Sequence, residues 1–208
     1  MSVLAEALAP LYRAYLRRLD EMAARIGGKA ALREPLLRDD AQRPVRNDSG
    51  FLTRFDLADG GTGETFEVHG AHADEPATRE VVVGALPFHI DAGNWEELTV
   101  RCVFDEAPAA DAAAALAQLV HGWAVLAAHG GFMGENVPDA EATRASGWSG
   151  RLHSAIVRTE GAEIVASLDL GTCAPSALDA LAAALAAFAR EVAPLGRVVI
   201  GGTRAEDS

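Results

Sequence analysis

Apolar residues recur along the chain with two different spacings. Over residues 2–26 they fall at steps of three and four, the spacing that places side chains on one face of an α-helix. The same spacing recurs over residues 109–129 and from Ser176 to about residue 192. The pattern therefore predicts three long helices, and Ser176 with Asp179 resembles a capping box at the start of the last one.

Alternation of apolar and polar residues indicates the strands. The clearest example runs from Leu98 to Phe104, where every second residue is apolar. The turn-forming residues 59–63 predict a hairpin, and Glu160-Gly161 predicts another tight turn. Further strands are expected at residues 51–57, 66–68, 81–83, 88–90, 152–159 and 163–170, with a final edge strand at 198–200.

Together these elements predict an α+β fold, a two-layer sandwich in which a mostly antiparallel sheet carries two long helices on one face. Residues 97–108 and 163–175 each lead through an Ala-Pro loop into a helix, so a ββα repeat is one interpretation and chance similarity is the other. The polar segment 40–50 separates an N-terminal helical arm, residues 1–40, from a single α+β domain, residues 41–208.

The chain is acidic, with 30 Asp and Glu residues against 18 Lys and Arg residues and a formal net charge of −12. A nucleic-acid-binding protein needs a basic surface, so this balance argues against that class. Residues 59–111 hold 12 acidic side chains against Arg79 and Arg101. The excess is therefore local in the sequence, and a local excess can steer a basic protein partner.

The sequence indicates neither a membrane nor a secretory destination. No uninterrupted apolar run reaches the roughly 18 residues that a membrane helix needs. Residues 1–10 lack the basic region and the long apolar stretch of a secretory signal. Cys102 and Cys173 are too few for a disulfide framework, so a reduced cytoplasmic setting is expected.

Within the acidic stretch, Trp95 is flanked by carboxylates. Tryptophan is enriched at interaction hot spots, so this pattern is typical of an interface anchor, and the alternative is a tryptophan folded back over the sheet edge. Trp148, in a loop rich in Gly and Ser, raises the same two interpretations. The predicted interaction residues are Asp74, Glu75, Asp91, Trp95, Glu96, Glu97 and Trp148.

Two segments offer a different chemistry. His69, His72 and Asp74, with Glu75 beside them, resemble an incomplete metallo-hydrolase motif that lacks part of its ligand set, so a polar surface loop is favoured and no metal or cofactor is predicted. The Gly-rich loop 129–141 follows a helix, whereas phosphate-binding loops precede one. A helix end with turn residues is therefore the favoured interpretation of that loop.

These observations favour a non-catalytic, acidic binding protein that acts on a basic protein partner. A bacterial immunity-like protein that neutralises a toxin has the same profile of small size, acidity and α+β fold. One alternative is a small hydrolase that uses the His69–Asp74 segment or the 129–141 loop. The other is an oligomerising subunit, in which the apolar stripe of the N-terminal arm packs on a second copy to form a homodimer.

Overall fold

The computed structural model describes most of the chain. The described residues are 3–26, 30–32, 57–66, 68, 72–134, 140–146 and 148–202. The helices are α1 (Val3–Ile26), α2 (Ala110–Ala128), α3 (Glu141–Ser146) and α4 (Ser176–Glu191). The strands are β1 (Ala30–Leu32), β2 (Leu57–Asp59), β3 (Thr65–Phe66), β4 (His72–Val83), β5 (Leu86–Asn94), β6 (Leu98–Phe104), β7 (Ser154–Glu160), β8 (Glu163–Asp169) and β9 (Leu195–Gly202).

A six-stranded sheet forms the centre of the fold, in the order β4-β5-β9-β6-β8-β7. Its neighbouring strands are antiparallel except for β5 and β9, which are parallel. β9 is therefore a central strand, which corrects the expectation of an edge strand over residues 198–200. The error has a physical origin: a short apolar run such as Val198–Ile200 does not show whether a strand has one neighbour or two.

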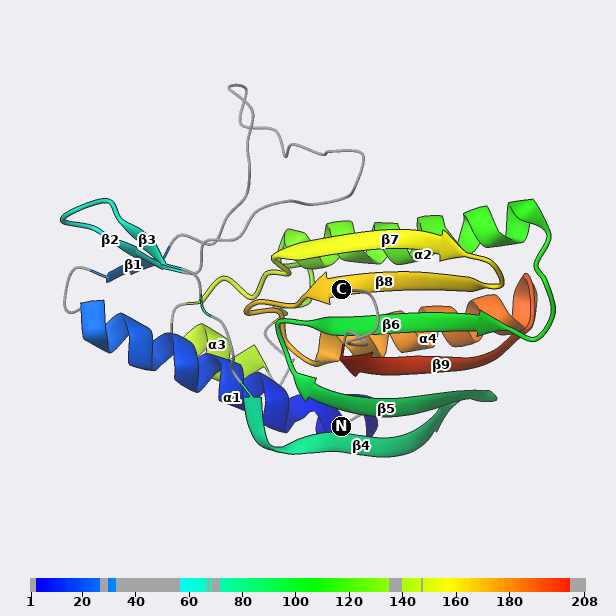
Figure 1. Cartoon of the computed structure of the whole chain (residues 1–208), viewed down its shortest axis with the longest axis horizontal. Helices are drawn as coiled ribbons and strands as arrows, with labels where there is room; N and C mark the ends of the chain where they lie inside the picture. Colours follow the sequence, from blue (N-terminus) through cyan, green and yellow to red (C-terminus); the bar gives the residue numbers. More distant parts are fainter. Residues whose placement is uncertain are drawn as a thin grey trace, which may run out of the picture.

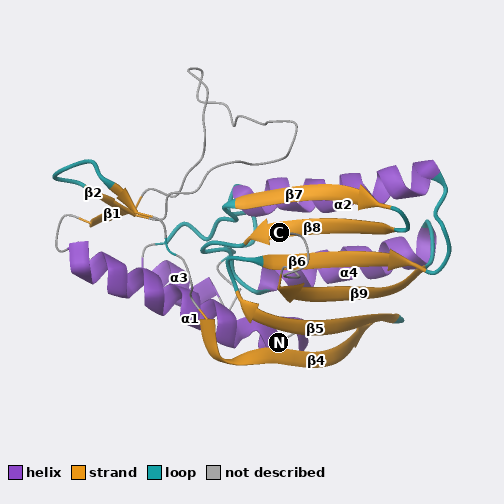
Figure 2. Ribbon diagram, viewed as in Figure 1, coloured by secondary structure: helices purple, strands orange, loops and turns teal. Residues whose placement is uncertain are grey.

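The long helices lie on one side of this sheet. Figures 1 and 2 show α2 and α4 behind the strands, with α1 beside them behind β4, while strands alone form the other side of the described sheet. The core fills the space between the layers, where Trp123 Nε1 of α2 donates to the Ala177 carbonyl oxygen at 2.7 Å. The predicted two-layer α+β sandwich is confirmed. β7, β8 and α4 form a hairpin followed by a helix, whereas β9 separates β5 from β6.

α1 belongs to the same core as the sheet. Its most deeply buried side chains are Leu4, Leu8, Leu11, Tyr15 and Leu19. Asp179 Oδ1 accepts a hydrogen bond from the Ala5 N–H at 3.1 Å, so this carboxylate satisfies a free donor in the first turn of α1. α4 begins at Ser176, with Pro175 at the N-cap position and no side-chain hydrogen bond from that residue, so the helix starts one residue earlier than a Ser176 cap predicts.

A second, three-stranded sheet in the order β1-β2-β3 lies next to α1. The hairpin predicted at residues 59–63 is present, with Asp59 Oδ1 accepting the Gly61 N–H at 2.6 Å and Gly63 at a φ of 75°. Residues 51–56 of the expected preceding strand lie outside the described residues. The Gly-rich loop 129–141 leads into α3, a short helix that the sequence pattern did not reveal.

Within the described part of the chain, α2 is the one helix that is long and apolar enough, by length and composition, to cross a membrane. A core helix of a soluble protein passes the same test, so this finding is weak support for a membrane segment. One face of α2, which includes Leu116, Val120 and Trp123, is buried, and the helix packs against β7, β8 and α4.

Candidate functional site

The side of the sheet that faces away from the helices, called here the open face, carries a transverse row that mixes polar and aliphatic side chains. Strand pairing places one residue from each strand side by side in this row, in the order Glu80, His89, Val199, Arg101, Val165 and Arg158. Successive residues of a strand point to opposite faces, so this row lies opposite the buried side chains of Phe88 and Val100. Val103 lies two residues beyond Arg101 on the same strand and face, and three valines therefore surround Arg101.

This face is hollowed over β4, β5, β9 and β6. The hollow has a volume of about 840 Å³, and the charged residues around it are Glu80, Asp91, Glu163, Arg101 and Arg197. Arg101 Nη1 lies 3.4 Å from Glu163 Oε2, and His89 Nδ1 lies 3.6 Å from Glu80 Oε1. Aliphatic side chains interleaved with paired charges are typical of the contact surfaces between proteins.

A smaller pocket of about 320 Å³ adjoins the hollow, and Thr99 lines both. The pocket lies where the bend after β5 meets the paired strands β6, β7 and β8. Its polar lining residues are Glu96, Glu97, Thr99, Ser154, Ser167 and Asp169, and none of the described residues that line it is basic. Glu96 and Asp169 are buried, whereas Glu97 is exposed. We refer to this site below as the acidic pocket.

Two turns hold the buried carboxylates of the acidic pocket. Glu96 lies in the bend between β5 and β6, where its own N–H donates to Asn94 Oδ1 at 2.9 Å. Asp169 ends β8, and its Oδ1 accepts the Gly171 N–H at 3.0 Å. Trp95 Nε1 donates to the Gly171 carbonyl oxygen at 3.0 Å, so this buried indole ties the two turns together.

His153 packs directly against the turn that carries Asp169. Its Nδ1 lies 3.9 Å from Asp169 Oδ1, and its backbone N–H donates to the Asp169 carbonyl oxygen at 2.9 Å. A Cβ atom at Gly171 would lie only 2.3 Å from the His153 ring, and Gly171 has a φ of 51°. Only glycine fits this position, both because of its backbone conformation and because of the ring against it.

Thr172, in the same turn, connects it to the chain before β7 and to α1. Its Oγ1 accepts the N–H groups of Gly150 and Arg151 at 3.0 and 3.1 Å. Its carbonyl oxygen accepts the Tyr12 hydroxyl at 3.2 Å. Hydrogen bonds from three separate parts of the chain therefore fix the turn that positions Asp169.

The Thr99 hydroxyl of β6 differs in its hydrogen bonding from that of Thr172. The residue is only 5% exposed, and its Oγ1 has no hydrogen-bond partner among the described residues. It lines the acidic pocket opposite Ser167, its partner in the β6–β8 ladder. A buried hydroxyl without a partner carries a desolvation cost that a bound ligand can remove.

The structure buries three of the predicted interaction residues. Trp95 is fully enclosed, with its ring centroid 5.4 Å from that of Tyr12, and Trp148 and Glu96 are also buried. An interface anchor must reach its partner, so the prediction of Trp95 and Trp148 as exposed anchors is wrong and both are core residues. For Trp95, burial of a large ring together with a satisfied N–H outweighs the polarity of its sequence neighbours.

The remaining predicted residues have different locations. Asp91 and Glu97 are exposed, and they line the hollow and the acidic pocket respectively. The backbone of Asp74 and Glu75 belongs to β4, but their side chains lie outside the described residues. Glu96, although buried as a residue, also lines the acidic pocket, so its carboxylate is a candidate ligand group rather than a surface contact.

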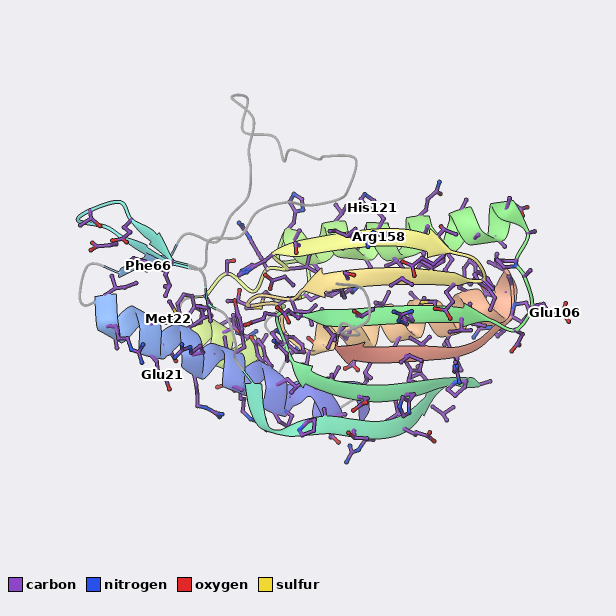
Figure 3. All side chains as sticks on the ribbon, in the orientation of Figure 1. Glu21, Met22, Phe66, Glu106, His121 and Arg158 are labelled. Carbon is purple, nitrogen blue, oxygen red and sulfur yellow. The ribbon has the colours of Figure 1, made fainter. Side chains whose placement is uncertain are left out.

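The acidic stretch 59–111 does not form one continuous surface. Figure 3 places Glu106 at one end of the main sheet and Phe66 at the opposite end of the molecule, next to Met22 of α1. Phe66 belongs to the hairpin that also carries Asp59. The charge that is local in the sequence is therefore distributed in space, and only part of it reaches the open face.

Sequence reasoning missed Asp169, Thr99, Ser154 and Ser167. These residues come from strands far apart in the sequence, and only the register of β6, β8 and β7 brings them to one pocket. One local signal was present: Asp169-Leu170-Gly171 stands at the end of the strand predicted over 163–170, and an aspartate shortly before a glycine at a strand end is typical of a structured turn.

The two segments with an alternative chemistry lie partly outside the described residues. Among the described residues, no group of three or more His, Cys, Asp or Glu side chains could hold a metal ion. His69 and the side chains of His72 and Asp74 lie outside them. In the 129–141 loop, residues 129–134 end α2 through backbone hydrogen bonds to its last carbonyl groups. Burial raises the pKa of the Cys102 thiol from 9.0 to about 12, which keeps it neutral and unreactive.

Comparisons with known proteins add no functional information. No family model, no curated protein and no solved structure matches this chain. The functional argument therefore depends on the geometry, which offers a sheet face that no described helix covers, a hollow with aliphatic and charged walls, and an acidic pocket beside it.

Proposed function

We propose that this protein is a non-catalytic binding protein that holds a polypeptide partner on the open face of its six-stranded sheet. The observation that supports the proposal is the row across that face, in which the half-buried Val199 and the buried Val165 flank the half-buried Arg101. A sheet face that meets only water is expected to be polar. An arginine among apolar groups instead fits a protein interface, since arginine is enriched in such surfaces.

The charges around the two hollows favour a basic partner. Six acidic side chains line the hollow and the acidic pocket against two arginines. One of these arginines, Arg101, is engaged by Glu163 at 3.4 Å. An acidic field of this kind accelerates association with a positively charged protein and orients it. The expected partner is therefore a polypeptide that presents both aliphatic and basic side chains.

The proposal includes a cytoplasmic setting. It also includes one specific form of the binding function, the neutralisation of a toxin. A small acidic protein that covers a basic surface can act by neutralising its partner, as an immunity-like protein does with a toxin. In that form, association is faster at low salt, because exposed charges are screened beyond about 8 Å at physiological ionic strength.

Site-specific photo-crosslinking tests the location of the partner. A photo-reactive amino acid replaces His89, which is exposed on the open face, and in a matched control it replaces Gln118, which is exposed on α2. In cells of the source organism, we expect the protein to cross-link to a second polypeptide from position 89 and to form no cross-link from position 118. No cross-link from position 89, or equal cross-linking from both positions, contradicts the proposal.

A further inference from the structure

We propose that the acidic pocket receives the guanidinium group of an arginine side chain on the polypeptide partner. This inference depends on the proposed function, since it names the group that anchors the partner beside the open face. The pocket volume of about 320 Å³ is at the lower end of the range for ligand sites. It therefore has room for one long side chain rather than for a larger ligand.

The chemistry of the lining selects a cationic donor. Glu96 and Asp169 are buried carboxylates, and the exposed Glu97 stands at the entrance. Ionised carboxylates only accept hydrogen bonds, and the hydroxyl groups of the lining can accept them as well. A guanidinium offers five N–H donors in a planar fork and no acceptor, and it pairs with carboxylates in a bidentate geometry. An anion would meet like charges here, and an apolar group would leave the buried Thr99 hydroxyl without a partner.

The hydroxyl of Thr99 is the second, independent indication of a ligand. Its Oγ1 is buried beside the pocket and has no hydrogen-bond partner among the described residues. Most buried polar groups in proteins are satisfied, so such an atom requires an explanation. An N–H group of a guanidinium bound between Glu96 and Asp169 supplies the missing donor.

The pocket is held in one arrangement by its surroundings. Trp95 fixes the bend that carries Glu96 against the turn that carries Asp169, through the bond from its Nε1 to the Gly171 carbonyl oxygen. The Gly171 N–H occupies one oxygen of Asp169, and His153 lies behind the same oxygen. These contacts orient the carboxylates before binding, which reduces the entropic cost of holding a ligand.

A small probe tests this inference on the full-length protein. N-acetyl-arginine amide is titrated into the ¹⁵N-labelled chain at neutral pH, and the neutral isostere N-acetyl-citrulline amide serves as the control. We expect the arginine probe to shift the amide resonances of Glu96, Thr99 and Ser167. The citrulline probe should bind about tenfold more weakly or not at all, because charge-assisted hydrogen bonds are roughly twice as strong as neutral ones. Equal binding of the two probes, or shifts confined to other surfaces, overturns the inference.

A pair of matched variants separates binding from folding. Thr99→Val removes the unpartnered hydroxyl with little change of shape, and Thr159→Val makes the same change at an exposed position of β7. Thr99→Val should weaken the arginine probe several-fold and leave the unfolding temperature unchanged or higher, while Thr159→Val should change neither. Unchanged affinity in a folded Thr99→Val protein contradicts the inference.

The two proposals fail in different ways. If position 89 cross-links to a polypeptide but the arginine probe does not reach the pocket, the inference about arginine is wrong and the binding function stands. If the probe occupies the pocket but position 89 does not cross-link, the pocket binds arginine without a partner on the open face. In that case the proposed function is the part that is wrong.

Discussion

Replacing Trp95 by phenylalanine tests how the acidic pocket is built. The substitution keeps an aromatic ring and removes the N–H that donates to the Gly171 carbonyl oxygen at 3.0 Å. Gly171 is buried, so this oxygen is left without its donor inside the protein. The expected cost of such a loss is about 1–3 kcal/mol.

Packing adds a second contribution to the effect of Trp95→Phe. Trp95 is fully buried against Tyr12, with ring centroids 5.4 Å apart, so a smaller ring leaves a void. Losing part of a buried ring costs about 1 kcal/mol more. The expected loss is therefore about 2–4 kcal/mol, a large fraction of a typical stability of about 5–15 kcal/mol.

Trp123→Phe is the matched control, because Trp123 is also buried and also donates from Nε1, to the Ala177 carbonyl oxygen at 2.7 Å. Urea unfolding should show a comparable loss of stability for both variants, at an unchanged dependence on denaturant. Only Trp95→Phe should weaken the arginine probe, since the Trp123 side chain connects α2 to α4 and does not line the acidic pocket. If Trp95→Phe stays within about 0.5 kcal/mol of the wild type, or if both variants weaken the probe equally, the account of the two turns is wrong.

Three further predictions follow from individual contacts. Burial raises the pKa of the Cys102 thiol from 9.0 to about 12, so the unfolded chain loses this proton at a lower pH than the folded protein does. The free energy of unfolding, measured in urea, should therefore fall as the pH rises from 9.0 to about 12, and it should fall less in Cys102→Ala. Asp179→Ala should cost about 1 kcal/mol and speed hydrogen exchange in the first turn of α1, because it removes the oxygen that accepts the Ala5 N–H; unchanged exchange speaks against this cap. Gly161→Ala and Gly171→Ala both place a side chain at a positive φ, which costs about 1 kcal/mol, but only the Gly171→Ala methyl group clashes with the His153 ring. The unfolding temperature should therefore fall much further for Gly171→Ala, and equal losses contradict this packing.

The elements that the sequence predicted well are those with a local, repeated signal. β6 was identified from its alternation, and the three long helices from their apolar stripes, because each signal extends over several turns or residue pairs. The position of β9 could not be predicted in this way. It pairs with β5 and β6, strands about a hundred residues earlier, and no local pattern encodes such a pairing.

Trp95 shows why the candidate site was only partly predictable. Its neighbours in the sequence are acidic, which favoured a surface position, whereas its hydrogen-bond acceptor is Gly171 in a distant turn. Glu96 and Glu97 were identified as candidate residues because they lie in the same acidic segment. Asp169 and Thr99 were not, since only the strand register brings them to the same pocket.

The most direct measurement of the central claim is the dissociation constant of the cross-linked partner, once purified, for two matched variants. Val82 is 67% exposed and lines the hollow on the open face, whereas Val192 is 58% exposed at the end of α4. Arginine at either position is compatible with folding, but at position 82 it places a positive charge where a basic partner is proposed to dock. We expect Val82→Arg to weaken binding by about tenfold or more and Val192→Arg to leave it unchanged. Equal dissociation constants for both variants and the wild type would contradict the claim that the open sheet face binds the partner.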